Sequence, residues 1–437
     1  MNSMLCATML AAVLAAAPDE RTKAILNDRQ SVEGDGYWIY NDLPRAFDEA
    51  RKEGKPLVVV LRCVPCAACA QLDADIVRRD PTVQGLLDEF VCVRIVNANG
   101  LDLSLFQYDY DQSFAAFFLN ADQTIYGRFG TRSHETESRR DVSIEGFARA
   151  LEGALELHRA YPKNRAALAG KRGPEAAVKT PEQFPSLKGR YGPRLAAEGN
   201  VAASCIHCHQ VGEAIRREFR DRGEAMPERV LFPYPLPNVL GLTLDPKQKA
   251  RVAEVEAGST AANDGFRDGD ELISLEGQPL LSIADVQWVL HNAAEAGRLE
   301  AEVRRGDQQI SIPLTLPPGW RRRGDLSWRA TTWDLRRMAA GGMVLSSLSA
   351  DEHRQAGLTD GSLALRVKYL GEYGEHGAAK QAGFRKGDIV IEVDGRREPL
   401  SESGVLTTLV NRTRLGQKVK VNVLRDGGRV SLELPMQ

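Results

Sequence analysis

The sequence predicts an α/β domain, then a short helical segment bearing Cys and His, and finally two related, mainly-β (α+β) domains. Three observations predict this order. Apolar strand-like runs alternate with helical patterns up to about residue 160. A stretch rich in Pro, Gly, Lys and Ala then runs over 161–193 without periodicity, as expected of a linker. The region beyond it contains an internal repeat, and at 437 residues the chain is too long for one hydrophobic core.

The bulk composition narrows the class of protein. Hydrophobic residues make up 43% of the chain and charged residues 27%, as in an ordinary globular protein, so neither pervasive disorder nor a polytopic membrane protein is predicted. The formal net charge is -2, and a phosphate-binding surface would need a clustered basic excess. We therefore expect no nucleic-acid partner.

The first residues predict export. An apolar run from Met4 ends in three alanines at Ala17, before a charged stretch. Residues 1–17 resemble a secretory signal peptide, although no Lys or Arg precedes the run. The run is too short to cross a membrane, so we expect no transmembrane span in the mature chain and a periplasmic or other extracytoplasmic location.

The α/β domain is predicted over 36–160. Its clearest element is the β-branched run 57–61, which follows Gly54-Lys55-Pro56 and has the character of a strand buried on both faces. The runs 91–96 and 115–119 repeat that character, and 144–157 has the apolar spacing of a helix.

Three cysteines follow the first of these strands directly. They are Cys63, Cys66 and Cys69, and a helical stretch begins after them. A helix N-terminus stabilises a thiolate, and a second thiol one turn later can resolve a mixed disulfide. The segment from Lys55 onward resembles the thioredoxin-like domains of thiol:disulfide interchange proteins. That resemblance implies Cys66 as the attacking thiol and Cys69 as the resolving one, but Cys63-x-Pro-Cys66 is also a redox motif, so the pairing stays open.

Two positions depart from that resemblance. Ser113 stands where a cis-proline usually faces the disulfide, and Val60 replaces a buried acid. A structural disulfide, or a zinc site with a fourth ligand from elsewhere, remains the alternative. Cys92 lies within a strand pattern and is expected to be a buried core thiol.

A second cysteine motif lies in the segment 194–237. Cys205, Cys208 and His209 form Cys-x-x-Cys-His, the haem-c attachment signature, in which two thiols bind the vinyl groups and the imidazole binds the iron. Haem c is therefore the expected cofactor, with Met226 as a candidate sixth ligand. The alternatives are a disulfide between the two cysteines, or zinc bound by them and His209.

The internal repeat defines the last two domains. The motif 265–270 recurs at 383–388, and in each copy Gly-Asp leads into an apolar strand and a turn. These motifs resemble bacterial PDZ domains of the periplasmic-protease type, predicted here over 238–317 and 335–435. The resemblance implies that a peptide C-terminus binds as an added strand.

The carboxylate-binding loop of the first copy would be Leu240-Gly241-Leu242, and the corresponding candidate in the second is Gly342-Met343-Val344. The alternative for either copy is a packing or dimerisation module. The chain contains no Gly-x-Ser-x-Gly, so a serine protease is not predicted.

The whole combination resembles a bacterial family described as thioredoxin-like/PDZ domain-containing proteins, some of which carry selenocysteine. We therefore expect an extracytoplasmic thiol-disulfide and electron-transfer protein that exchanges electrons with a thiol or disulfide partner and recruits a protein through its PDZ groove. The competing hypothesis is a non-enzymatic PDZ scaffold whose cysteine sites are structural or metal-binding.

Overall fold

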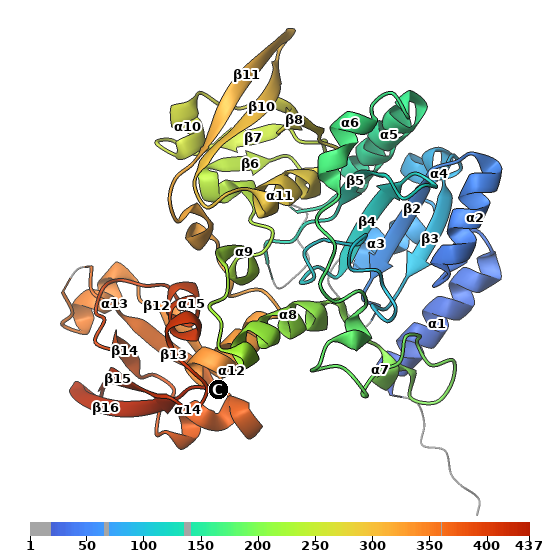
Figure 1. The fold of residues 1–437 in the computed structure, drawn as a ribbon. Coiled ribbons are helices and arrows are strands. Elements are labelled where there is room, and N and C mark those ends of the chain that lie inside the picture. The colour runs from blue at the N-terminus through green and yellow to red at the C-terminus, as the bar shows by residue number, and fades with distance from the viewer. Residues whose placement is uncertain (1–18, 65–69, 135–140, 360) are drawn as a thin grey trace, which may run out of the picture.

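The computed structural model describes residues 19–64, 70–134, 141–359 and 361–437. Figure 1 shows an N-terminal domain in blue and teal, a first repeat domain in yellow and a second repeat domain in orange and red. Helix α8, in green, lies between the N-terminal domain and the second repeat domain. No helix among the described residues combines the length and the apolar character needed to cross a membrane.

The N-terminal domain is built on a five-stranded sheet in the order β1-β3-β2-β4-β5. Strands β1, β2 and β3 pair in parallel, whereas β4 and β5 are antiparallel to their neighbours. Apolar side chains fill both faces, with Val58 and Val60 on one side of β2 and Leu57 and Val59 on the other. The strands are β1 Ile39–Tyr40, β2 Leu57–Arg62, β3 Val91–Ile95, β4 Phe114–Leu119 and β5 Ile125–Phe129, and the helices are α1 Glu20–Asp35, α2 Leu43–Glu53, α3 Ala70–Val77, α4 Pro81–Leu87 and α5 Ile144–Ala160.

The predicted strands at 57–61, 91–96 and 115–119 and the helix at 144–157 are confirmed. The domain also includes α1, which lies before the predicted start at residue 36. Val32 of α1 is part of the sheet's core, and Asp28 pairs with Arg94 of β3 at 2.7 Å.

The chain between the N-terminal domain and the first repeat domain packs against its neighbours. Phe184 and Leu187, which belong to the segment predicted as a linker, share a small core with Leu103 and Ile206. This packing fixes the Cys-His segment against the N-terminal domain. The elements are α6 Arg165–Leu168, η1 Ala169–Lys171, η2 Pro181–Gln183, α7 Val201–Ser204, α8 Cys208–Arg222, α9 Glu228–Leu231 and η3 Pro237–Leu240.

The two repeat domains each have their own sheets and core. The first has a four-stranded sheet, β11-β10-β8-β9, beside the pair β6-β7, and the second has one five-stranded sheet, β12-β13-β14-β15-β16. The elements of the first are β6 Leu242–Leu244, β7 Val252–Val255, α10 Thr260–Asp264, β8 Glu271–Leu275, β9 Gln278–Pro279, α11 Ile283–Asn292, β10 Gly297–Arg305 and β11 Gln308–Leu316. After η4 Trp320–Arg323 come α12 Thr332–Ala340, β12 Met343–Ser347, α13 Ala350–Gln355, β13 Leu365–Leu370, η5 Gly374–Gly377, α14 Ala378–Gln381, β14 Ile389–Val393, α15 Glu402–Arg412, β15 Lys418–Arg425 and β16 Gly428–Pro435.

The repeated Gly-Asp motif has the same structural role in both copies. Arg305 of β10 donates to both carboxylate oxygens of Asp270, each at 2.8 Å. Arg425 of β15 does the same to Asp388, each at 2.7 Å. Both aspartates are buried, so each motif holds the start of one strand against the long hairpin of its sheet.

The first repeat domain is attached to the N-terminal domain through α11, whose residues 283–290 are all buried. Lys171 and Asp285 are each 1% exposed and form an ion pair of 2.9 Å. The guanidinium of Arg128, at β5, lies 3.8 Å from the centre of the Trp288 ring. Buried charges in contact across two domains fix their relative placement, because breaking one pair leaves an uncompensated charge.

A second buried cluster joins the N-terminal domain, α8 and the chain that leads into α12. We call it the Arg329 cluster, and its members are Asp109, Asp111, Arg216, Arg329 and Thr331. Arg329 Nη1 lies 2.6 Å from Asp109 and 3.1 Å from Asp111, and the Thr331 amide donates to Asp111 at 2.8 Å. Arg216 of α8 donates to the Thr331 hydroxyl at 2.7 Å. Three parts of the chain that are distant in sequence therefore meet at one polar cluster.

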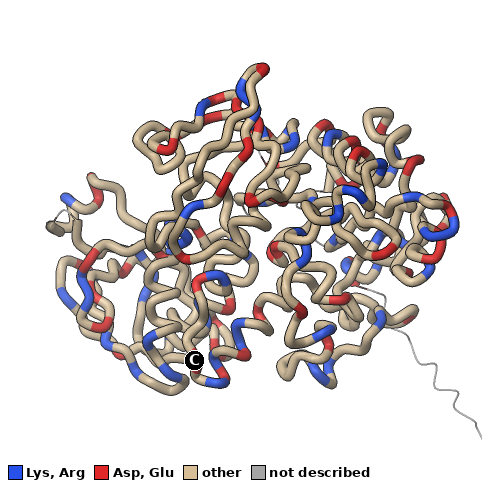
Figure 2. The backbone as a smooth tube through the Cα atoms, turned by 45° about the horizontal axis from the view of Figure 1, so that its top comes forward, with Lys and Arg blue, Asp and Glu red and all other residues tan. Residues whose placement is uncertain are grey.

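Charges on the rest of the molecule are mixed. Figure 2 shows Lys and Arg interspersed with Asp and Glu along the N-terminal domain and both repeat domains.

Candidate thiol site and peptide sites

Cys63 lies where β2 ends, at the carboxyl edge of the parallel strands. Its amide donates to the carbonyl of Ser113 at 2.9 Å, and the Arg62 guanidinium donates to the same carbonyl at 2.9 Å. Ser113 immediately precedes β4, and its backbone lies beside Cys63. Cys66 and Cys69 lie outside the described residues, and α3 begins at Ala70.

A buried charge network lies beneath this edge. Asp73 of α3 pairs with Arg62 at 3.2 Å and with Arg94 of β3 at 2.6 Å. Val60, which replaces the acid that the resemblance implies, is fully buried. The carboxylate that binds Arg62, next to Cys63, comes from Asp73 of α3. Because both arginines are buried, the network holds the end of β2 and the start of α3 in fixed positions. Sequence reasoning missed this network.

The Cys-x-x-Cys-His segment packs directly onto the same edge of the N-terminal domain. The amide of Ala98 donates to the Ile206 carbonyl at 2.9 Å, and the Asn99 side chain accepts from the Ile206 amide at 2.8 Å. His207 Nδ1 lies 3.4 Å from Cys63 Sγ. Cys63 and the Cys-x-x-Cys-His segment, which are distant in sequence, therefore lie together.

Burial controls the ionisation of these groups. It raises the pKa of Cys205 to about 12 and also raises the pKa of the Cys208 thiol, whose Sγ accepts a hydrogen bond from the Tyr108 hydroxyl at 3.0 Å. Burial lowers the pKa of His207 to about 4, so its ring is neutral at pH 7. Burial also lowers the pKa of His209. The Glu213 carboxylate, 2.9 Å from Nδ1, outweighs this effect, so the pKa of His209 is raised overall.

The side chains as they lie do not fit a haem. Attachment requires both thiols to face the edge of one macrocycle, whereas Cys205 is 2% exposed and its Sγ lies 4.0 Å from the Val96 carbonyl. Met226 is buried in the core of the second repeat domain, where its amide donates to Asn411 at 2.8 Å. Among the described residues no group of three His, Cys, Asp or Glu side chains is arranged to hold a metal ion.

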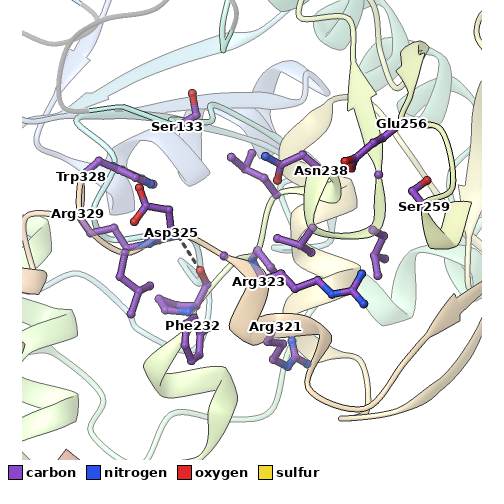
Figure 3. Close-up of a pocket in the computed structure, with 18 of the residues that line it drawn as sticks. Ser133, Phe232, Asn238, Glu256, Ser259, Arg321, Arg323, Asp325, Trp328 and Arg329 are labelled. Carbon is purple, nitrogen blue, oxygen red and sulfur yellow. Dashed lines mark hydrogen bonds between the residues drawn. The ribbon is translucent and has the colours of Figure 1, made fainter. Parts of the chain in front are cut away.

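The predicted peptide loop of the first repeat domain lies at a cavity. Gly241 has a φ of +91°, and a Cβ there would come within 2.1 Å of Ser259 Oγ, so only glycine fits. The side chains of Leu240 and Leu242 are buried in the core. The cavity, of about 530 Å³, lies between this loop and the chain before α12, and Figure 3 shows Glu256 and Ser259 on one side with Asp325 and Trp328 opposite.

In the second repeat domain a helix lies against the strand and the helix that would line a peptide groove. Helix α12 packs against both β12 and α15, with Leu335 and Met338 in the core. The Leu345 amide of β12 donates to the Glu402 carboxylate of α15 at 2.8 Å, and Arg336 of α12 binds the same carboxylate at 2.7 Å. The amide that faces α15 therefore already has a partner within the domain.

Comparison with known families gives the domains their names. Residues 38–121 match the thioredoxin-like family model, and residues 238–316 and 373–436 match the PDZ domain model.

Curated relatives are periplasmic proteases. The chain is 25% identical over 187 residues to a probable periplasmic serine endoprotease DegP-like of Pseudomonas savastanoi pv. phaseolicola, covering 42% of this chain and 36% of that protein. It is 30% identical over 100 residues to the DegP-like protein of Rhizobium meliloti, with coverages of 21% and 20%. The periplasmic pH-dependent serine endoprotease DegQ of Escherichia coli is 26% identical over 154 residues, with coverages of 35% and 30%. The chain thus spans about a third or less of the length of these relatives.

Among solved structures, the HtrA-type protease AlgW with a decapeptide aligns with 32% of this chain and 47% of its own, at 18% identity and a TM-score of 0.20.

The predicted fold class is confirmed. The molecule consists of an N-terminal thioredoxin-like domain followed by two PDZ domains, PDZ1 and PDZ2.

Proposed function

We propose that this protein is an extracytoplasmic thiol-disulfide exchange protein whose PDZ domains recruit a protein partner. One observation carries the proposal: Cys63 Sγ lies at the end of β2, 3.4 Å from the imidazole of His207 and beside Ser113. A neutral imidazole in contact with the sulfur can accept its proton, and the thiolate so formed is the species that exchanges disulfides.

The surroundings of Cys63 support exchange rather than a purely structural role. The Arg62, Asp73 and Arg94 network holds both ends of the cysteine segment in fixed positions. A catalytic group gains from such preorganisation, because no reorganisation is then needed when the substrate arrives. The pairing among Cys63, Cys66 and Cys69 stays open, and the resemblance implies Cys66 as the attacking thiol and Cys69 as the resolving one.

PDZ1 is the candidate for peptide recruitment. Leu240 and Gly241 of its predicted carboxylate-binding loop line the cavity of about 530 Å³. In PDZ2 helix α12 packs against β12 and α15. An extracytoplasmic location is supported by the predicted signal peptide and by relatives whose names describe them as periplasmic.

Single Cys→Ser variants at positions 63, 66 and 69 test the exchange. We expect the Cys63→Ser variant to lose at least about tenfold in insulin-disulfide reduction, because the thiolate is the nucleophile. Cys92→Ser is the matched control, since Cys92 is buried in the core on β3 and burial raises its pKa to about 12. Full activity in all three variants would favour the non-enzymatic scaffold.

Haem attachment and electron transfer remain predictions of the Cys-x-x-Cys-His motif, and they have a separate test. Protein matured in an export-competent host is examined for a Soret band, with Cys205→Ser as the control. Absence of the band from the wild type would remove the electron-transfer role and leave thiol exchange.

A further inference from the structure

We propose that Cys205 and Cys208 are a second redox-active pair, which exchanges disulfides with Cys63 inside the same molecule. This inference rests on the proposed function, because it names the internal partner of the thiol site. It assigns to the Cys-x-x-Cys segment a dithiol role in place of a haem-binding one.

The placement of the segment is the first argument. Residues 205–208 lie against the edge of the thioredoxin-like domain that carries Cys63, where His207 contacts the Cys63 sulfur at 3.4 Å. The backbone of Ile206 is held there by two hydrogen bonds, from the Ala98 amide at 2.9 Å and to the Asn99 side chain at 2.8 Å. Both partners belong to the loop after β3, so the thioredoxin-like domain itself presents the dithiol.

The second argument is reach. His207 contacts Cys63 at 3.4 Å and is the residue next to Cys208, and neighbouring Cα atoms are only about 3.8 Å apart. A disulfide needs Cα atoms about 4.4–6.8 Å apart. The Tyr108 hydroxyl donates to Cys208 Sγ at 3.0 Å. Burial is the main cause of the raised pKa of Tyr108, and Cys208 and Cys63 both add to the rise. The proposed exchange requires the side chains of Cys63 and Cys208 to rotate toward each other from these positions.

Burial makes the pair selective for an internal partner. Cys205 is almost fully buried and Cys208 is half-buried, so a large external disulfide cannot approach Cys205. A buried thiol ionises rarely, and this slows exchange with reagents in solution. Exchange within one molecule offsets this low reaction rate, because two neighbouring thiols react as if each were present at very high concentration.

The chemistry balances without a further reagent. Cys63 first attacks a substrate disulfide, which releases one substrate thiol and leaves the other substrate sulfur bonded to Cys63. Cys208 then attacks Cys63 Sγ, and its proton goes with the second substrate sulfur as that thiol leaves. Finally Cys205 attacks the sulfur of Cys208, and Cys63 leaves as a thiol. The net result is two substrate thiols and one Cys205–Cys208 disulfide, with two electrons passed from the pair to the substrate.

A trapping experiment on the full-length chain tests this inference. The fully reduced Cys205→Ser variant is mixed with insulin, and the products are digested without reductant and analysed by mass spectrometry. Without Cys205 the disulfide between Cys63 and Cys208, which forms in the second step, cannot be resolved. We therefore expect this disulfide to accumulate. It should persist in Cys205→Ser with Cys92→Ser and be lost in Cys205→Ser with Cys63→Ser.

Wild-type protein provides a readout that does not depend on a variant folding. Reduced wild type should form a Cys205–Cys208 disulfide after one round with insulin in the absence of added reductant. If insulin is reduced but neither this disulfide nor the trapped species appears, the internal pair is wrong and the proposed function stands. If insulin is not reduced at all, the proposed function fails. Covalent haem on both thiols, or trapping through Cys66 or Cys69 in place of Cys63, would also overturn the inference.

Discussion

At the scale of single residues, His291 links the end of α11 to the chain that enters PDZ1. Its ring stacks on Tyr234 with centroids 4.0 Å apart, and its Nδ1 accepts a hydrogen bond from the Tyr234 amide at 3.2 Å. Burial lowers the pKa of His291 to about 3, since a protonated ring would lose both water and this bond. The native state therefore holds the neutral ring.

This depressed pKa predicts acid sensitivity. An unfolded histidine titrates near 6.5, so between pH 6.5 and about 3 the unfolded state binds a proton that the folded state does not. The stabilisation is complete above pH 6.5 and is lost as pH falls. We expect His291 to account for about 2 kcal/mol of lost unfolding free energy between pH 7 and pH 5. Urea unfolding at both pH values measures it, and His291→Gln should show a correspondingly smaller loss. Equal losses in the two proteins would contradict this assignment.

The repeated aspartates give a second residue-scale prediction. Asp388→Asn keeps the shape of the side chain but removes the charge that balances Arg425, so we expect PDZ2 to lose about 3 kcal/mol of stability. Asp270→Asn should destabilise PDZ1 in the same way through Arg305. Hydrogen exchange, read separately for each domain, checks both, with the exposed turn residue Asp307→Asn as a control. If either variant lost hydrogen-exchange protection only in the other PDZ domain, the two aspartates would not have the same structural role.

Residue patterns predicted the thiol site in part. Cys63, Cys205 and Cys208 were found because their spacing is itself the signal of redox or haem chemistry. The contacts of His207 and Tyr108 were not found, because they join segments distant in sequence and no local periodicity records such a contact. Asp73 was missed for the same reason: its partners Arg62 and Arg94 lie on two different strands.

At the scale of elements, α12 ties together the strand and the helix of PDZ2 that would line a peptide groove. A PDZ ligand adds as a strand, so it must pair with backbone amides that face the groove. The amide of Leu345 is paired with Glu402, and Arg336 holds that carboxylate from α12. Helix α12 thus packs against β12 and α15 and is tied to the carboxylate that holds the Leu345 amide.

Weakening that contact should open PDZ2. We expect Arg336→Ala to leave the buried Glu402 carboxylate unbalanced, detach α12 and speed hydrogen exchange at the Leu345 amide by at least about tenfold. Glu398→Ala removes a partner of an exposed ion pair with Arg396 and is the matched control. Unchanged exchange at Leu345 in Arg336→Ala would show that the core contacts of Leu335 and Met338 alone hold the helix.

Elements with a strong local pattern were predictable and those fixed by long-range packing were not. Strand β2 is a continuous β-branched run, so its type follows from sequence alone. The segment 161–193 lacks periodicity and was predicted as a linker, but Phe184 and Leu187 anchor it to a core built from other parts of the chain. Helix α1 has almost no amphipathic pattern, which is why it fell outside the predicted domain.

At the scale of the whole molecule, the Arg329 cluster connects the PDZ region to the thiol site. Asp109 and Asp111 belong to the same loop as Tyr108, which contacts Cys208, and Ser113, which faces Cys63. Burial raises the pKa of Asp109, whereas Arg329, Arg216 and Thr331 outweigh burial and hold the pKa of Asp111 below its usual value. The chain between PDZ1 and PDZ2 therefore stabilises the charges on a loop that forms one wall of the thiol site.

Removing Arg329 should loosen the domains and alter the thiols together. Arg329→Ala leaves two buried carboxylates without their cation, which costs about 3–5 kcal/mol when one partner of a buried pair is lost. We expect a larger radius of gyration in X-ray scattering and faster alkylation of Cys63 and Cys208 than in the wild type. Arg323→Ala, on an exposed side chain of the same connection, is the control and should leave both unchanged. If Arg329→Ala expands the molecule while thiol reactivity stays constant, the cluster holds the domains together but does not communicate with the thiol site. The Arg329 cluster would then have a purely structural role, because the loop that holds Tyr108 and Ser113 would keep its shape without the Arg329 guanidinium.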